Sequence, residues 1–585
     1  MCSIIGYKGK MPAAQLLVDS LRRMEYRGYD SVGMATINGE RRILVRKGVG
    51  KVAEVSGSLN LVEMQGHVGI GHTRWATHGR VTDDNAHPHL SCSHKNAIVH
   101  NGIIENYKEL KEELIQKGHE FKSQTDSEVI AHLLEEHYRD DVKKAMIETC
   151  KKLKGSYAFV AVFDDATIAG ARYDEPLIVG IAKGGYFLSS DVLGFLEHTD
   201  KAMFLDNGDI VILNHKLQTF DFSGKKVTRP ITQVAWELNA VDKGRYAHYT
   251  LKEINEQKYT IPLAAKQDPL RIRTFCDTMA RAKHIYITGS GTSYNSALIA
   301  KHILSKYVKI KTETIMSSEF QYAPDILDEE SVLVAISQSG ETADILHSVK
   351  TAKASKAKIL SIVNVPTSSL ARMSDTFLET NCGPEIGVAA TKSFTGQLAI
   401  IYNVADKLSY GAMGISDGVE ISRLVEEVLT RSESISHIAS NFKTVKDVYL
   451  LGRALHYPIA LEGALKLKEL AYTHAEGLPA GELKHGPLAL MDKNTKVIIL
   501  NPSDSTYKDT ISNAHEIKAR GSEVIGISDE YDEVYDHWVA IPKVNEVLYP
   551  LFEVIPLQIL AYYTALNRNA DPDYPRNLAK SVTVK

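Results

Sequence analysis

A cysteine at position 2 is the first residue whose type and place could do chemistry, because the chain begins Met1-Cys2-Ser3. Removal of the initiating methionine would leave Cys2 with a thiol and a free α-amino group. The thiolate is the nucleophilic form, but a thiol with a pKa of about 8.5 is only slightly ionised at neutral pH. An α-amino group with a pKa of about 7.7–8.0 is well matched as its general base. By itself, position 2 could also be an ordinary, poorly ordered terminus.

Three polar clusters interrupt apolar, strand-like runs in the first third of the chain. They comprise residues 71–79 (GHTRWATHG), which 85–89 (NAHPH) follow, then 100–106 (HNGIIEN) and 123–128 (SQTDSE). An arginine can pair with an α-carboxylate and an aspartate with an α-ammonium group. An Asn-Gly pair offers a side-chain amide and a backbone N–H for an oxyanion hole. With a cysteine nucleophile, these groups suit attack on an amino-acid amide.

Two local features of these clusters have simpler interpretations. His78, His87 and His89 are zinc ligands by type, but no HExxH spacing or nearby carboxylate set supports a metal, so we expect none. The third cluster is typical of a helix N-terminus that Asp126 or Ser127 could cap.

Two loops in the second half are rich in glycine and hydroxyl groups. Residues 289–293 (GSGTS) and 337–342 (SQSGET) each follow an apolar strand and open a helix. Backbone N–H groups at a helix N-terminus suit a phosphate. Neither loop has the GxxxxGK[ST] pattern or the dinucleotide GxGxxG pattern with its downstream acid. Either alone could be a capped turn, but together they favour a sugar-phosphate site without ATP or NAD.

Further charged residues lie in residues 461–471, which are expected to form a helix. Glu462, Lys466 and Glu469 fall on one face of that helix, and their spacing alone favours a solvated ion-pair stripe. The loop 481–487 holds His485, a potential proton-transfer group, while the tail 575–585 is unusually apolar for a terminus.

The elements that must position these residues differ between the two halves. The first third mixes strands and helices without strict alternation, which indicates layered α+β packing. The expected strands are Ser3–Tyr7, Ser31–Ile37, Val68–His72, Asn96–His100, Ala158–Phe163 and Ile178–Ile181, and the expected helices are Met11–Met24, Glu105–Gly118 and Ser127–Tyr138. Residues 205–245 are expected to be a β-poor connection that ends the first domain.

After residue 283 buried strands alternate with helices, the pattern of parallel βαβ units, and the pattern occurs twice. Residues 284–289 match 447–452, 331–337 match 495–501, and 359–364 match 524–529, at offsets of 163, 164 and 165 residues. Near-constant offsets predict a duplicated α/β fold with ligands at the carboxyl ends of its strands. The second copy is expected to lack the hydroxyl-rich loops of the first.

The composition excludes several classes of protein. The chain has 585 residues, 44% of them hydrophobic and 24% charged, with a formal net charge of -4, which argues against a general nucleic-acid or membrane-surface binder. Its five cysteines are scattered without a CxxC pair, which is typical of a reducing compartment. We see neither a signal peptide nor a run of about 18 apolar residues, so we expect a cytosolic protein.

The first third resembles the glutaminase domain of the glucosamine-6-phosphate synthase family. The resemblance rests on Cys2, residues 26–31 (YRGYDS), 72–79, 85–89, 100–102 and Thr125-Asp126. It implies an N-terminal-nucleophile hydrolase, an αββα sandwich in which Cys2 attacks the glutamine amide. The other implied roles belong to Arg74 (substrate carboxylate), Asp126 (substrate amine), Asn101 and Gly102 (oxyanion hole), His78 and His87 (substrate site) and Trp75 (gate of an ammonia channel, on a mobile lid Arg74–Val81).

One departure from the family lies beside the nucleophile. The family usually has glycine there, whereas this chain has Ser3. A Cβ could crowd the approach of the backbone to the substrate unless position 3 has ordinary strand geometry. We expect an active glutaminase.

The remainder resembles the isomerase half of the same family, built from two doubly wound sugar-isomerase domains. Its segment 249–257 (YTLKEINEQ) matches the family's opening of that half, although Lys258 replaces the usual proline, and 388–392 reads VAATK where the family has VASTK. The resemblance assigns fructose 6-phosphate binding to Thr292, Ser293, Ser337, Gln338, Ser339 and Thr342, with Val388 and Ala389 lining the sugar. It assigns a Schiff base to Lys580, proton shuttling to Glu469, charge stabilisation to Lys466, and ring opening to His485 from the partner of a homodimer.

The whole chain is therefore expected to transfer the amide nitrogen of glutamine to fructose 6-phosphate and isomerise the product to glucosamine 6-phosphate, without a cofactor. This would be the first step of UDP-N-acetylglucosamine biosynthesis, with ammonia channelled between two sites. The expected domains are 1–240, 241–425 and 426–585. Alternatives are an amidotransferase or deaminase acting on another sugar phosphate, a phosphoribosyl-type amidotransferase, which would need an acidic pair and a diphosphate loop, and a sugar-phosphate sensor.

Overall fold

The computed structural model describes residues 2–234, 242–323, 326–413 and 418–583. The chain divides into two compact units, Met1–Ala240 with Ser581–Lys585, and Val241–Lys580. The predicted domain boundary at 240/241 falls outside the described residues, and the predicted division at 425/426 lies inside the second unit.

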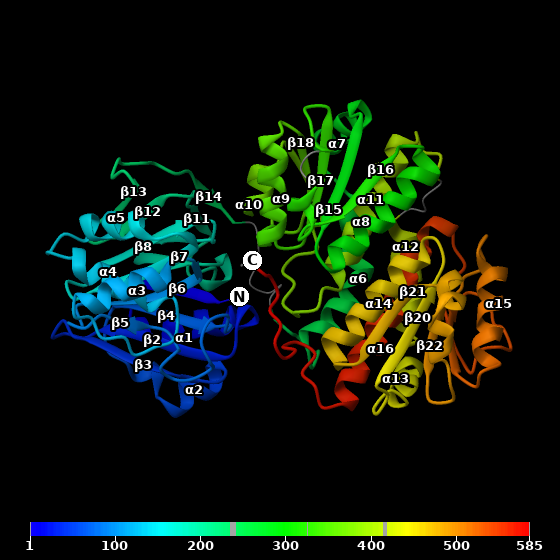
Figure 1. The fold of residues 1–585 in the computed structure, drawn as a ribbon, viewed down its shortest axis with the longest axis horizontal. Coiled ribbons are helices and arrows are strands. Elements are labelled where there is room, and N and C mark those ends of the chain that lie inside the picture. Colours follow the sequence, from blue (N-terminus) through cyan, green and yellow to red (C-terminus); the bar gives the residue numbers. More distant parts are fainter. Residues whose placement is uncertain (1, 235–241, 324–325, 414–417, 584–585) are drawn as a thin grey trace. The chain divides into compact units, whose positions relative to one another are not determined.

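The first unit is built on two antiparallel sheets (Figure 1). One sheet has the order β14-β11-β9-β10-β1-β4-β2-β3 and the other β13-β12-β8-β7-β6-β5. Its strands are β1 Ser3–Gly9, β2 Ser31–Ile37, β3 Ile43–Val49, β4 Val68–Arg74, β5 His89–Leu90, β6 Asn96–Ile104, β7 Gly155–Phe163, β8 Ile168–Tyr173, β9 Ile178–Ala182, β10 Gly185–Ser189, β11 Lys201–Phe204, β12 Asp209–Leu213, β13 Leu217–Asp221 and β14 Ile231–Gln233. Its helices are α1 Ala13–Arg23, α2 Val52–Ser58, α3 Tyr107–Gln116, α4 Glu128–His137 and α5 Val142–Lys152.

The two sheets pack face to face, and helices cover their outer faces. Ile4 of β1 and Val160 of β7 belong to one buried cluster between the sheets. Leu133 of α4 and Phe159 of β7 share a second cluster on the outer side of the six-stranded sheet. On the other side, Gly71 of β4 lets α1 approach closely, since a Cβ there would lie 3.0 Å from Leu21 Cδ1. The predicted αββα sandwich is confirmed.

Within the described residues, the second unit contains two five-stranded sheets whose neighbouring strands all pair in parallel. Their orders are β16-β15-β17-β18-β19 and β21-β20-β22-β23-β24, so the same topology occurs twice. The strands are β15 His284–Gly289, β16 Thr312–Met316, β17 Ser331–Ser337, β18 Lys358–Val363, β19 Thr376–Glu379, β20 Asp447–Gly452, β21 His474–Pro479, β22 Lys496–Leu500, β23 Glu523–Ser528 and β24 His537–Ala540. The helices are α6 Tyr249–Ala265, α7 Pro269–Arg281, α8 Thr292–Ile303, α9 Ala343–Ala354, α10 Ser369–Met373, α11 Lys392–Leu408, α12 Gly418–Leu429, α13 Ser432–Ser440, α14 His456–Ala471, α15 Tyr507–Lys518 and α16 Tyr549–Asn567.

The predicted duplication is confirmed in register. The three matched pairs of sequence runs form β15 and β20, β17 and β22, and β18 and β23. We call the β15–β19 half the first copy and the β20–β24 half the second copy. One continuous hydrophobic core joins them, and it includes Phe394 of α11 and Leu557 of α16.

Two local predictions in the first unit are wrong. Residues 205–245 hold β12, β13 and β14, because short apolar runs such as 209–213 pair between closely spaced turns that obscured them. Neither Asp126 nor Ser127 caps α4. Asp126 instead accepts a hydrogen bond from the Ile104 amide (2.7 Å), and Ser127 Oγ pairs with His100 Nδ1 (2.8 Å).

One helix corrects the expectation that the chain holds no long apolar run. Within the described residues, Glu546–Asn567 is long and apolar enough to cross a membrane. However, 94% of its apolar window is buried inside the protein, where it packs against both copies. We therefore interpret it as a core helix.

Candidate active sites

Strand pairing positions Cys2 beside the end of β4 in the first unit. Ser3 at the start of β1 lies opposite Thr73, so the residue before it faces the chain that leaves β4. The Trp75 amide donates a hydrogen bond to Cys2 Sγ at 3.3 Å. Burial raises the pKa of the Cys2 thiol, while the Trp75 amide and the charge of Arg74 oppose that rise. A thiol that is reluctant to ionise needs a nearby base before it can attack.

Asn101 reaches Cys2 from the other sheet, where it precedes Gly102 in the second half of β6. The Asn101 side-chain amide donates to the Cys2 carbonyl at 3.0 Å. Burial lowers the pKa of His72 to about 3, so its ring is neutral and its Nε2 lies 3.2 Å from Asn101 Oδ1. This contact turns the Asn101 amide nitrogen toward Cys2. Gly102 has φ +116°, and a Cβ there would lie 2.1 Å from the Ser156 carbonyl oxygen, so only glycine fits.

Arg74 lies close enough to the nucleophile to interact with it electrostatically, and Asp126 interacts with Arg74 in the same way. Burial lowers the pKa of Arg74, and the charges of Cys2, Asp30 and Asp126 oppose the shift. The guanidinium donates to the carbonyl of Arg80 at 3.2 Å and also to that of His78, which holds the 75–80 loop. A second contact secures this loop, since the Ala76 amide donates to Asp30 Oδ2 at 2.8 Å.

The histidines of the first two clusters do more packing than the sequence indicated. His87 is buried, stacks on His72 with ring centroids 4.2 Å apart, and accepts a hydrogen bond from the His100 amide. Burial keeps the pKa of His87 well below its ordinary value, so its ring is neutral. His78 is half-buried with its ring against Tyr107. Substrate binding by His78, by His87 and by the half-buried Trp75 stays a prediction.

Ser3 is accommodated without strain. It lies in β1, is fully buried, and its hydroxyl donates to the Met24 carbonyl at 2.8 Å. Its side chain therefore points into the fold, where the hydroxyl has a partner.

In the second unit, both glycine- and hydroxyl-rich loops lie at the carboxyl ends of neighbouring strands. Residues 289–293 follow β15, residues 337–342 follow β17, and these two strands pair. The strand order reverses between them, which is where open α/β sheets bind ligands. Ser337 Oγ accepts from the Gly340 amide at 3.1 Å and lies 3.5 Å from Thr342 Oγ1. Ser293 is anchored by Gln397 at 3.0 Å, and Gln338 and Ser339 are half-buried beside Ser337.

The charged face of α14 is buried, so the expected solvated stripe is wrong. Glu462 and Lys466 are fully buried, and Lys466 Nζ lies 2.6 Å from Glu469 Oε2. Burial alone would lower the pKa of Lys466, but Glu462 and Glu469 hold it above its ordinary value. Thr292 of the first copy accepts from Lys466 at 3.2 Å. Helical spacing identified the face, and the packing of α8 against α14 decided that it is covered.

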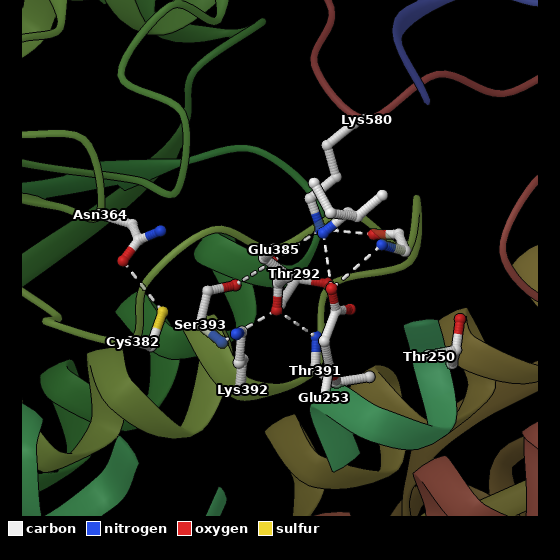
Figure 2. A network of polar contacts seen from close by, with 12 residues as sticks. Thr250, Glu253, Thr292, Asn364, Cys382, Glu385, Thr391, Lys392, Ser393 and Lys580 are labelled. Atoms are coloured by element: carbon white, nitrogen blue, oxygen red, sulfur yellow. Dashed lines mark hydrogen bonds and ion pairs between the residues drawn. The ribbon is translucent and has the colours of Figure 1, made fainter. Parts of the chain in front are cut away.

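Lys580 in the tail is held by an acid that the sequence analysis did not identify. Its Nζ donates to Glu385 Oε2 and to the Gly387 carbonyl, both at 2.6 Å (Figure 2). Burial opposes ionisation of Glu385, but Lys580 and hydrogen bonds from Ser393 and Thr391 hold its pKa at about 2. The signal was an acid among apolar residues in 384–387 (PEIG), directly before the VAATK motif.

Glu253 and Lys392 are the other buried charges of this network. Burial raises the pKa of Glu253 to about 8, with Glu385 adding to the rise and Lys392 opposing it. Glu253 accepts from the Ile386 amide at 2.6 Å, and Lys392 pairs with Glu256 at 2.7 Å. The loop from Ile386 to Lys392 carries the predicted sugar-lining pair, Val388 and Ala389, which are both buried.

His485 is the predicted residue that this chain does not bring to the others. It is exposed at the end of a short 3-10 helix, Ala480–His485, and makes no hydrogen bond or ion pair with any other described residue. This placement leaves the predicted role in a partner's site open.

Comparison with known proteins matches each half separately. Residues 58–260 match the family model of a glutamine amidotransferase domain, and residues 278–405 and 442–568 each match that of a SIS domain. Together with the sandwich fold around Cys2 and the duplicated parallel sheets, these matches define an N-terminal-nucleophile amidotransferase joined to two SIS domains.

Full-length relatives identify the family. Enzymes named glutamine--fructose-6-phosphate aminotransferase [isomerizing] are 44% identical over 604 residues in Thermococcus kodakarensis and 42% identical over 600 residues in Aquifex aeolicus, with 100% of both chains covered in each case. The chain belongs to the family of isomerizing glutamine–fructose-6-phosphate aminotransferases. Among solved structures, the C-terminal domain of glucosamine-fructose-6-phosphate aminotransferase from Francisella tularensis is 36% identical, with a TM-score of 0.52, and covers 57% of this chain and 99% of its own.

Proposed function

We propose that this enzyme transfers the amide nitrogen of L-glutamine to D-fructose 6-phosphate and isomerises the adduct to D-glucosamine 6-phosphate, releasing L-glutamate. The observation that carries the proposal is the full-length match, at up to 44% identity, to enzymes named for these two substrates. The reaction would supply the first step of amino-sugar biosynthesis. An amidotransferase acting on another sugar phosphate is the alternative.

In the first unit, Cys2 Sγ would attack the side-chain carbonyl carbon of glutamine. The Asn101 amide and the Gly102 N–H would stabilise the oxyanion, while Arg74 and Asp126 would hold the substrate's carboxylate and amine. Ammonia leaves as the thioester forms, and water then cleaves the thioester to glutamate. Because burial raises the pKa of the Cys2 thiol, the α-amino group exposed by loss of Met1 would serve as its base.

In the second unit, the two loops after β15 and β17 would bind the phosphate through backbone N–H groups and the hydroxyls of Ser337 and Thr342. Lys580 would condense with the ketose carbonyl as a Schiff base. An ammonium group paired with a carboxylate is not a nucleophile, so Lys580 must first lose a proton and separate from Glu385. Glu469 would then move the proton between C1 and C2, and Lys466 would steady the developing negative charge.

Ammonia has to reach the sugar unprotonated, because ammonium has no lone pair with which to add to a carbonyl. We propose a closed path for it, with the Arg74–Val81 segment as a lid and Trp75 as a gate. We also propose that sugar phosphate orders the tail that carries Lys580. The same rate of glutamine hydrolysis with and without sugar phosphate would contradict this ordering.

We further propose a cytosolic homodimer in which each partner lends its His485 to ring opening. The proposed domains are 1–240 for glutamine hydrolysis, 241–425 for phosphate binding and 426–585 for isomerisation.

The test is release of glutamate and amino sugar from glutamine plus fructose 6-phosphate by the wild-type protein and by Cys2→Ala. The wild type should release both, and the variant should form amino sugar only from added ammonia. Amino sugar from ammonia but not from glutamine in the wild type would assign the defect to the first unit. No amino sugar from either nitrogen source would overturn the acceptor, and a panel of hexose phosphates would then identify the alternative.

A further inference from the structure

Four side chains that no motif grouped meet in the first unit, away from the residues around Cys2. Cys92 lies in the turn between β5 and β6, His119 follows α3, and His132 and Glu135 lie on one face of α4. One potential ligand atom from each lies within 4.8 Å of all the others. Three separate segments thus converge on one point.

Four of the six distances between the ligand atoms of this cluster lie within a few tenths of an ångström of those in a tetrahedral ligand set. Cys92 Sγ lies 3.6 Å from His132 Nδ1 and 3.9 Å from His119 Nδ1. Glu135 Oε2 lies 3.2 Å from His119 Nδ1 and 3.7 Å from His132 Nδ1. With Zn–S of about 2.3 Å and Zn–N of about 2.0 Å, a regular tetrahedron separates its ligand atoms by about 3.3–3.5 Å.

Both imidazoles turn the same nitrogen toward the cluster and the other toward a carboxylate. His119 Nε2 lies 3.2 Å from Glu136 Oε1, and His132 Nε2 lies 3.7 Å from Glu128 Oε1. Metal-bound histidines typically have such a carboxylate behind them, because it orients the ring and strengthens it as a ligand. His132 is only 1% exposed, so its orientation is set by packing.

The remaining two ligands are also held in place. Glu135 accepts hydrogen bonds from the Cys92 amide (3.0 Å) and the Ser93 amide (2.6 Å). Cys92 Sγ accepts a hydrogen bond from the Glu120 amide at 3.3 Å. Thus backbone donors orient the carboxylate and the sulfur before any ion binds.

We propose that Cys92, His119, His132 and Glu135 bind a zinc ion as a closed, four-coordinate structural site. One thiolate, two imidazoles and one carboxylate are a donor set that suits Zn²⁺. Binding releases the Cys92 proton to water and joins the sulfur to the metal. The ion would tie the β5–β6 turn and the segment after α3 to α4, whose N-terminus directly follows Asp126.

The test is a cobalt titration of chelator-treated, reduced full-length protein, because Co²⁺ reports tetrahedral geometry and thiolate bonding through its absorption. We expect one Co²⁺ per chain with a thiolate-to-cobalt charge-transfer band, displaced by an equimolar amount of Zn²⁺. Cys92→Ser should abolish the charge-transfer band, and His119→Ala should lose metal binding. His94→Asn is the matched control, since His94 lies in the same turn with φ +58° but outside the cluster.

A second variant keeps the test decisive if removal of a ligand unfolds the unit. Glu136→Gln removes the carboxylate behind His119, which also pairs with Lys117 at 3.3 Å, and should weaken Zn²⁺ affinity about 10- to 100-fold. Cys2→Ala should leave the charge-transfer band unchanged, which assigns the thiolate to Cys92. A wild-type protein without tetrahedral cobalt bands, or equal zinc affinity in the wild type, Glu136→Gln and Cys92→Ser, would overturn the site.

Discussion

The two copies of the second unit have the same sheet order but different side chains where their first helices begin, a neutral serine in one and a charged histidine in the other. In both copies a glycine ends the first strand, and the backbone of the residue four positions later packs so closely against it that a Cβ would not fit. The residue at this later position is therefore equivalent in the two copies. That residue is Ser293 after Gly289 in the first copy and His456 after Gly452 in the second. The chemistry of the two strand ends therefore diverges from one common backbone.

The second copy fills this position with buried charge. His456 is fully buried, with Nδ1 2.9 Å from Glu553 and Nε2 3.0 Å from Asp504. Burial alone would lower the pKa of His456, but the two carboxylates raise it to about 10. Asp504, which follows β22, and Glu553 of α16 place two acids beside this position, which disfavours a phosphate there, whereas the equivalent position in the first copy holds the neutral hydroxyl of Ser293.

The loop after β22 also corrects one expectation, because it does contain hydroxyls. Ser503 donates to Asp529 at 2.5 Å, and Thr506 donates to Asp504 at 2.7 Å. Hydroxyls that already donate their hydrogen bond to a carboxylate cannot donate it to a bound anion. The comparison teaches that hydroxyl content identifies a phosphate loop only when the hydroxyls do not already donate to a neighbouring carboxylate.

The largest expected effect concerns the catalytic contribution of the second copy. Glu469→Gln should lower kcat for amino-sugar formation from ammonia by about 10²- to 10⁴-fold, because proton transfer between C1 and C2 loses its base. The KM for sugar phosphate should stay unchanged, since the proposed phosphate loops belong to the first copy. The control is Glu476→Gln, which changes an exposed acid on β21 and should leave the steady-state kinetics unaltered. A rise in KM with normal kcat would place Glu469 in binding instead.

The second effect concerns the stability of the charged core. His456→Ala should destabilise the second unit by about 3–5 kcal/mol, because it leaves the buried Glu553 and Asp504 without a counter-charge. Ser293→Ala, at the equivalent position, should cost about 1 kcal/mol, the worth of one hydrogen bond. Thermal unfolding followed by calorimetry measures both. Equal effects of the two substitutions would show that the copies are not differentiated in this way.

The third effect separates binding in one copy from structure in the other. Thr342→Val should raise the KM for fructose 6-phosphate about 10-fold or more, since a hydrogen bond to a charged phosphate contributes about 1.5–3 kcal/mol. Thr506→Val makes the same change at the equivalent loop of the second copy and should leave KM unaltered. An increase in KM from Thr506→Val would mean that both loops bind the sugar phosphate.

The smallest effect is a pH dependence. The folded pKa of His456, about 10, lies above its ordinary 6.5, so its stabilising charge is fully present below pH 6.5. This contribution should be lost as the pH rises toward about 10, by at most about 1.4 kcal/mol per pH unit. The melting temperature of the wild type should fall more steeply over this range than that of His456→Leu. Parallel curves for both proteins would contradict the assignment.

Much of the fold was predictable because periodicity and repetition are local properties of the chain. The runs 284–289 and 447–452 became β15 and β20, and the mixed strands of the first third became the expected sandwich. Residues 205–245 were misread because strands of three to five residues carry too short a pattern to outweigh their turns.

The site residues that could be predicted were likewise those whose own type and local motif indicate a role. Cys2, Arg74, Asn101 and Asp126 stood out by type, and the structure brings them within interaction range. Glu385 was missed, because its role depends on Lys580, which lies 195 residues along the chain. The proposed zinc ligands were missed for a similar reason, since Cys92 and Glu135 belong to different segments without a known spacing.

The sequence by itself determined the two fold classes, the duplication and the residue types at each strand end, because these follow from patterns within short segments. Only the tertiary structure decided which of those groups are buried and which meet. The face of Glu462, Lys466 and Glu469 is the clearest case, since helical spacing aligns them whether or not another element covers them. Packing α14 against α8 removed water from that face, and the loss of water converts an ordinary charge pattern into a candidate site for proton transfer.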